Sequence, residues 1–113
     1  MEVTEAKAYV KFVRITPRKV KILLDLIRGK NAKEAMGILN NTANGASMIV
    51  AKLLKSAMAN AENNFSMNAD NLFVSQCFVC PGPTLKRGQA RGRGGYDRLL
   101  KRTSHITIAV KEK

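Results

Sequence analysis

The chain has 113 residues, and 45% of them are hydrophobic. This is typical of one compact domain and excludes a fully disordered chain. The net charge of +12 exceeds what solubility requires, so we expect a polyanionic partner. Residues 1–30 carry eight Lys or Arg and three acidic residues, residues 31–80 carry three of each, and residues 81–113 carry nine and two. The positive charge therefore lies at the two ends of the chain, around a neutral centre.

The N-terminal segment predicts a strand followed by a helix. Residues 6–15 alternate loosely and are rich in β-prone types, which indicates a strand. Thr16 and Pro17 are the residue types favoured at a helix N-cap and at the first helical position. Gly29 is typical of the residue that ends a helix.

Two more helices are expected before residue 65. Asn31 and Glu34 have the spacing of a capping box, so a second helix should run to about Leu39. An apolar stripe from Ala46 to Ala61 predicts a third helix, which we expect to end at residues 63–64.

The C-terminal half predicts two strands and a long hairpin. Residues 72–79 are mostly apolar, as in a central strand, and residues 105–110 alternate as a half-buried strand does. Both strands are expected to continue into an antiparallel hairpin over residues 81–103, which could reach about 30 Å from the body. An isolated two-stranded ribbon is marginally stable in water, so this hairpin needs a surface to lie against. The predicted fold is α+β: a single domain over residues 1–113, with three helices packed on a small three-stranded antiparallel sheet and a protruding hairpin.

The segment from Lys86 to Arg102 has seven basic residues and one acidic residue, interspersed with glycine. Arginine offers paired donors to phosphate, glycine permits close backbone approach, and Tyr96 is able to stack on an unpaired base. Two alternatives to RNA binding are open for this segment: a solvated linker and a segment that binds a membrane surface. The flanking strands favour a hairpin over a linker, and the absence of an apolar face disfavours a membrane.

A second basic cluster lies in and around the first predicted helix. Its charges should contact phosphates without reading sequence, and the alternative is an ordinary solvated helix face. The candidate RNA-binding residues in this cluster are Arg14, Arg18, Lys19, Lys21, Arg28 and Lys30.

Patterns of catalysis, metal binding and membrane insertion are not found. Cys77 and Cys80 form a single pair, His105 is the only histidine, and zinc needs four ligands. Residues three apart on a strand point to opposite faces, so we expect ordinary packing, no metal, no cofactor and no small-molecule substrate. No apolar run could cross a membrane, and no secretory signal is recognisable, so we expect a cytoplasmic protein with reduced thiols.

Four blocks of sequence, at residues 17–30, 56–63, 82–87 and 100–106, together resemble the bacterial large-subunit ribosomal protein twenty-two family. The resemblance implies a non-catalytic protein of the large ribosomal subunit that binds 23S ribosomal RNA, contacts neighbouring ribosomal proteins and supports assembly. It also implies that the hairpin lines the polypeptide exit tunnel, touches the nascent polypeptide, and ends near where macrolide antibiotics bind in the family. The residues alone leave two other classes of protein open. One is a free nucleic-acid-binding module, and the other is an enzyme, for which no motif is found.

The resemblance also implies roles for individual residues. The expected RNA-binding residues of the hairpin and the adjoining strand are Lys86, Arg87, Arg91, Arg93, Arg98, Lys101, Arg102, Thr103, Ser104 and His105. The expected tunnel-facing tip is Gly88, Gln89, Ala90, Arg91, Gly92, Arg93, Gly94, Gly95 and Tyr96. The tip departs from the family at Ala90, Gly95 and Tyr96, where Pro, Arg and a small residue are usual.

Overall fold

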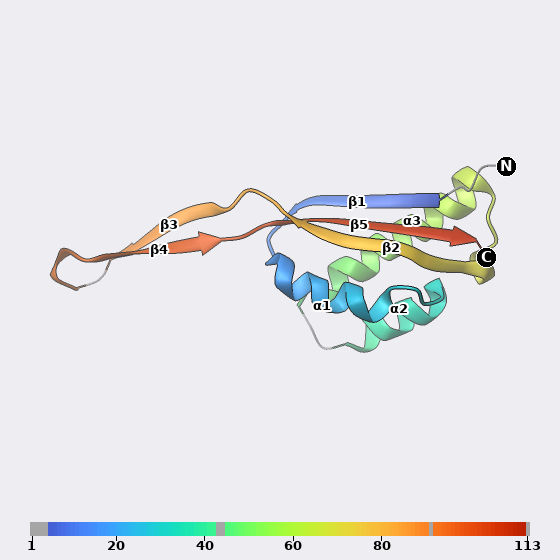
Figure 1. Cartoon of the computed structure of the whole chain (residues 1–113), viewed down its shortest axis with the longest axis horizontal. Helices are drawn as coiled ribbons and strands as arrows, with labels where there is room; N and C mark the ends of the chain where they lie inside the picture. The colour runs from blue at the N-terminus through green and yellow to red at the C-terminus, as the bar shows by residue number, and fades with distance from the viewer. Residues whose placement is uncertain (1–4, 43–44, 91, 113) are drawn as a thin grey trace.

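The structure is a computed structural model that describes residues 5–42, 45–90 and 92–112. It is elongated, with extents of 66 × 29 × 18 Å, because a two-stranded ribbon projects from a compact body (Figure 1). The elements in chain order are β1 (Glu5–Val13), α1 (Pro17–Ile27), α2 (Ala32–Asn41), α3 (Ser47–Phe65), the short 3-10 turn η1 (Ala69–Asn71), β2 (Leu72–Pro81), β3 (Leu85–Ala90), the turn η2 (Gly92–Gly94), β4 (Tyr96–Lys101) and β5 (Ser104–Glu112).

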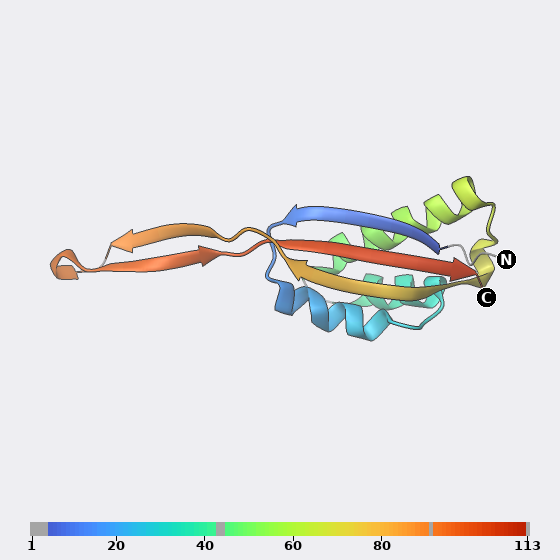
Figure 2. The ribbon, with the colours of Figure 1, turned by 45° about the horizontal axis from the view of Figure 1, so that its top comes forward.

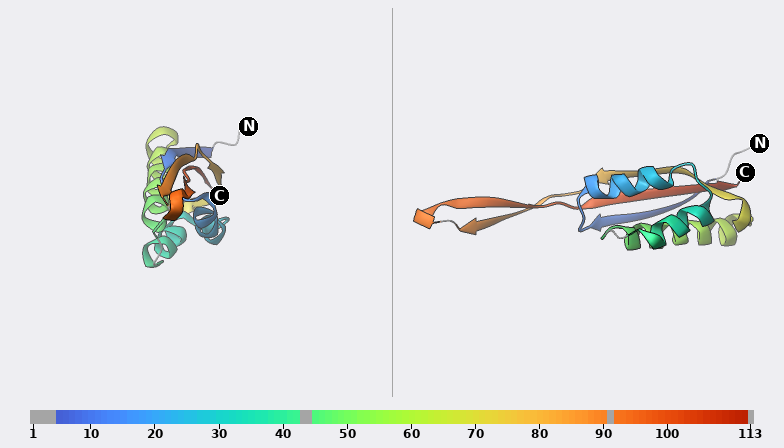
Figure 3. Two further views of the ribbon diagram at one scale, coloured as in Figure 1. Left: turned by 90° about the vertical axis from the view of Figure 1, so that its left-hand side faces the viewer. Right: turned by 90° about the horizontal axis from the view of Figure 1, so that it is seen from below.

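The body is an antiparallel sheet of order β1-β5-β2 with α1, α2 and α3 on one face (Figures 2 and 3). Helix α3 lies against β1 and β5, whereas α1 and α2 lie against β2. Within the described residues, strands β3 and β4 pair only with each other, and they form the projecting ribbon. The α+β fold, with three helices on a three-stranded sheet and a protruding hairpin, is therefore confirmed.

The hydrophobic core lies between the sheet and the three helices. In β5, Ile106, Ile108 and Val110 point toward the helices and are buried, as the alternating pattern predicts. Small residues of β1 and α3 let these two elements approach closely, among them Ala6, Ala8, Ala57 and Ala61. Burying each large aliphatic side chain contributes about 1.5–3 kcal/mol, so this interface stabilises the body without help from the ribbon.

The position of β2 differs from the prediction. Strand β5 is central and β2 is at the edge, although the apolar run in β2 suggests a central strand. In the structure Val74 and Cys77 face the helices while Phe78 on the opposite face is exposed. The apolar run reflects one buried face plus exposed hydrophobic residues on the other.

Two helices extend past their predicted ends. Helix α3 continues through residues 63–64 to Phe65 and ends at Ser66, which has a left-handed conformation. Because those asparagines are exposed, their weak helix propensity costs less than the helix gains by continuing. Helix α2 reaches Asn41, and the capping box is not formed, because Asn31 makes no side-chain cap. The backbone of Asn31 pairs with Phe73 of β2 instead.

Candidate nucleic-acid interface

The ribbon joins the body through a short neck, residues 82–84 and 102–103, that lies outside both sheets. The N–H of Gly82 donates to the Thr103 carbonyl at 2.9 Å, and the Thr103 hydroxyl donates to the Pro83 carbonyl at 2.7 Å. A Cβ atom on residue 82 would lie 2.5 Å from the Thr103 hydroxyl oxygen, so this close approach requires glycine. The neck therefore fixes the direction in which the ribbon leaves the body.

The two hydroxyl residues expected to contact RNA here are buried. The Thr103 hydroxyl donates to the carbonyl of Pro83, and the Ser104 hydroxyl donates to the carbonyl of Ile15. Neither hydroxyl is presented to a partner. Thr103 lies in the neck and Ser104 begins β5, and the RNA contacts expected for both residues stay predictions.

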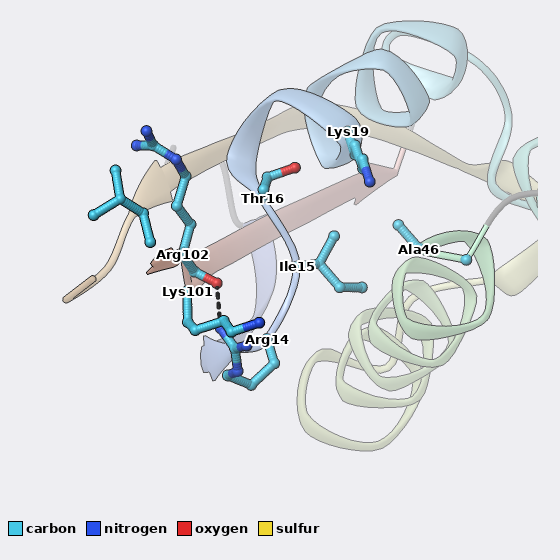
Figure 4. A pocket seen from close by; sticks show the side chains of 9 residues that line it. Arg14, Ile15, Thr16, Lys19, Ala46, Lys101 and Arg102 are labelled. Carbon is cyan, nitrogen blue, oxygen red and sulfur yellow. Dashed lines mark hydrogen bonds between the residues drawn. The ribbon is translucent and has the colours of Figure 1, made fainter. Parts of the chain in front are cut away.

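A basic hollow of about 600 Å³ lies where the neck meets the start of α1 (Figure 4). Its cations come from the turn before α1, from the first turn of α1 and from the end of β4. Ile15 and Ala46 form an apolar side of the hollow, and Lys19 reaches from α1 into the same space. A second hollow of about 440 Å³ adjoins it, lined by Thr16, Pro17, Arg18 and Arg102. The cations around the two hollows are Arg14, Arg18, Lys19, Lys101 and Arg102.

The positive charges around the basic hollow are not neutralised by acidic residues lining it. No acidic residue of the described chain lines either hollow. The first turn of α1 contains no acidic residue but has Arg18 and Lys19, although the amino end of a helix is itself positive. Each cation near the amino end of a helix lowers the stability of the helix by about 0.3–1 kcal/mol. A bound anion would relieve this repulsion.

Arg14 links the body to the ribbon. One of its guanidinium nitrogens, Nη1, donates to the carbonyl of Arg102 at 2.9 Å. The bond joins residues 88 positions apart and holds the end of β4 beside the start of α1 (Figure 4). Cations that are distant in sequence are thereby gathered at one site.

The other predicted cations of the N-terminal cluster lie elsewhere. The guanidinium of Arg28 contacts Asp25 at 2.6 Å and the Cys77 carbonyl at 2.8 Å. The hydrogen bond to Asp25 raises the pKa of Arg28, so its charge is already compensated inside the protein. Lys21 and Lys30 are exposed, but neither lines the basic hollow.

The ribbon carries cations on both of its faces. Residues directly opposite each other in an antiparallel pair share a face. By this register Lys86 and Arg98 lie on one face, and Arg87 and Lys101 lie on the other. All four are exposed. The ribbon is therefore suited to a site enclosed by polyanion, where both faces meet negative charge.

The tip is a tight turn. Arg93 and Gly94 both have positive φ, of 60° and 73°, and the N–H of Gly95 closes the turn on the Gly92 carbonyl at 3.1 Å. Of the other predicted tip residues, Gly88, Gln89 and Ala90 are exposed in β3. Arg91 lies outside the described residues.

The remaining candidate residues show no metal or redox geometry. Among the described residues, no group of three or more His, Cys, Asp or Glu could hold a metal ion. Cys77 is buried with its thiol 3.3 Å from the Leu24 carbonyl, and burial raises its pKa, whereas Cys80 is exposed. Within the described segments, no helix has the length and apolar character to span a membrane.

Sequence reasoning missed two parts of this site. Nothing in the local pattern distinguishes Gly82 from the other glycines, because its role depends on Thr103, which follows 21 residues later. Ile15 and Ala46 read as core residues, and only the tertiary structure places them beside the cations.

Comparison with known proteins gives one consistent result. The model of the family described as ribosomal protein L22p/L17e matches residues 8–111. The chain is 57% identical over 109 residues to the large ribosomal subunit protein uL22 of Oceanobacillus iheyensis, covering 96% of each chain. It is 58% identical to the protein of the same name from Thermoanaerobacter pseudethanolicus and 53% identical to that from Clostridium beijerinckii, covering 96% of this chain and 98% of each relative.

Proposed function

The chain belongs to the ribosomal protein L22p/L17e family, and we propose that it binds 23S ribosomal RNA through the basic hollow and the ribbon. Like its relatives it is a structural ribosomal protein and not an enzyme. In this proposal it acts in the cytoplasm, within the large ribosomal subunit, beside neighbouring ribosomal proteins.

The observation that carries the proposal is the gathering of uncompensated cations at the neck. Arg14, Lys19 and Arg102 come from separate segments, yet they line one hollow, and Arg18 lines the hollow that adjoins it. No described acidic residue lines either hollow. Lysine and arginine bind RNA mainly by neutralising phosphates and releasing counterions. A site of this kind positions the protein on folded RNA without reading its sequence. It would act during assembly by bridging phosphates from RNA segments that converge at the neck.

The ribbon supports the finer part of the proposal. Its strands pair only with each other, their described side chains are exposed, and cations occupy both faces. Such a ribbon is marginally stable alone, so enclosure by RNA would order it. We infer that the ribbon lines the exit tunnel, with residues 88–96 facing the nascent polypeptide and lying near the macrolide site of the family.

Salt dependence tests the RNA-binding proposal. We expect binding to a 23S RNA transcript to weaken steeply with salt, by about 0.7–0.9 log unit per log salt for each phosphate neutralised. The double variant Arg18→Gln/Arg102→Gln should make the slope shallower by about 1.4–1.8. The control, Lys52→Gln/Lys55→Gln, removes the same charge from exposed positions of α3 and should leave the slope nearly unchanged. A flat response of the unmodified protein would refute RNA binding, and equal slopes for the two variants would refute the two adjoining hollows as the site.

A second experiment separates the ribosomal protein from a free nucleic-acid-binding module. The chain should co-sediment with large subunits reconstituted without their own copy of this protein, in preference to free RNA or duplex DNA. Equal partition among subunits, RNA and DNA would favour the free module.

A further inference from the structure

The face of the sheet opposite the helices carries exposed aromatic side chains. All three helices lie on the other face, and no described element covers this one (Figure 3). Tyr9 is 62% exposed, Phe12 is 63% exposed and Phe78 is 46% exposed. Large exposed apolar patches on soluble proteins mark interaction surfaces, so we ask whether these three rings act together.

The register of the strands places two of these rings in one row. Tyr9 of β1 and Phe78 of β2 both pair with Thr107 of the central strand β5. Strands lie about 4.8 Å apart, so the Cα atoms of Tyr9 and Phe78 are about 10 Å apart. The two aromatic side chains therefore stand apart across a short polar residue instead of packing on each other.

Phe12 is held on this face by an unusual backbone. It lies at a β-bulge between Val10 and Val13 and has a φ of 60°, a conformation that bulky residues rarely adopt. Its N–H donates to Nδ1 of His105 at 3.1 Å, and its ring meets the His105 ring edge to face at 4.9 Å. Behind that histidine, a Cβ on Gly82 would approach the ring to 3.1 Å. The Phe12 ring is thus fixed in place although most of it is exposed, and strain of this kind concentrates at functional positions.

The charges on this face indicate the partner. Lys7 and Lys11 of β1 are exposed, and Lys111 of β5 is partly exposed. The acidic residue of the described part of the face is Glu5, which pairs across the strands with Lys111. Separated aromatic rings between lysines match single-stranded RNA, whose bases stack on the rings while cations track the phosphates. A protein partner would be expected to meet a continuous apolar patch with fewer charges at its centre.

We propose that this outer sheet face is a second RNA-binding surface, on which unpaired bases stack against Phe12, Tyr9 and Phe78. Lys7 and Lys11 hold the flanking phosphates. The inference rests on the proposed RNA-binding function but uses a face of the protein distinct from the basic hollow and from the ribbon.

An abasic oligonucleotide isolates the stacking contribution, because it keeps the phosphates and removes the bases. The probes are a ten-nucleotide oligoadenylate and its abasic counterpart, titrated against the full chain at several salt concentrations. The unmodified protein should prefer the oligoadenylate by about tenfold, within the range for aromatic residues that stack on bases. Phe12→Leu should lose most of that preference at every salt concentration without changing the salt slope, and Tyr9→Leu should lose part of it.

Two further variants control for folding and for general aromatic content. Phe12→Tyr keeps the ring and should bind as the unmodified protein does. Phe65→Leu removes an exposed aromatic residue at the end of α3, away from this face, and should leave the preference for bases unchanged. Amide resonances of Thr107 should shift with the oligoadenylate and not with the abasic probe.

Each outcome separates the inference from the proposed function. If Phe12→Leu and Tyr9→Leu keep the preference for bases, the stacking surface is refuted even if Arg18→Gln/Arg102→Gln still weakens binding to 23S RNA. That result would point to a protein partner for this face. If no variant changes binding to any RNA, the proposed function fails together with the inference.

Discussion

Replacing Gly82 by alanine tests how tightly the neck is built. The new methyl group would lie 2.5 Å from the Thr103 hydroxyl oxygen and 3.1 Å from the His105 ring. The hydroxyl would have to leave its 2.7 Å bond to the Pro83 carbonyl, and a buried unsatisfied hydroxyl costs about 1–3 kcal/mol. Overpacking adds about 1–3 kcal/mol. We expect the free energy of unfolding to fall by about 3 kcal/mol, measured by urea denaturation with circular dichroism.

The second site makes this prediction specific. Thr103→Ala alone loses one hydrogen bond and should cost about 1 kcal/mol. The double variant Gly82→Ala/Thr103→Ala should recover most of the loss caused by Gly82→Ala and come close to the stability of Thr103→Ala, because the hydroxyl that clashes is gone and the milder contact with the His105 ring remains. Gly37→Ala is the matched control: it lies in α2 with no atom near the new methyl group, and should stabilise by about 0.5–1 kcal/mol. Additive costs in the double variant, or a neutral Gly82→Ala, would show that the contact does not hold the neck.

Two further predictions concern the cysteines and the tip. Iodoacetamide should label Cys80 quickly and Cys77 only on unfolding, because Cys80 is exposed whereas Cys77 is buried and has a raised pKa. Mass spectrometry of the labelled peptides measures the two rates, and equal rates would contradict the buried position of Cys77. Replacing residues 88–96 with a short turn should leave the unfolding midpoint of the body nearly unchanged, because the core lies between the sheet and the helices. A large loss of ellipticity in that variant would instead make the ribbon part of the folding unit.

Local sequence patterns were sufficient to predict the helices and strands and the distribution of charge along the chain. Helix α1 begins at Pro17 after Thr16, as the residue types predict, and α3 buries the predicted apolar stripe. These features depend on residues a few positions apart, so periodicity and end signals report them directly. The excess of cations at both ends of the chain is likewise a property of composition alone.

The tertiary structure decided which of those residues work together. Arg14 and Arg102 are 88 positions apart, and Phe12 and His105 are 93 apart, yet each pair is joined by a hydrogen bond. It also made β2 an edge strand, and it buried Thr103 in the neck and Ser104 at the start of β5. Such pairings depend on how strands β1, β2 and β5 align, and no short window of sequence contains both partners. The sequence by itself therefore determined a basic α+β protein with a ribbon, and the alignment of distant strands decided where its cations and exposed rings lie relative to one another.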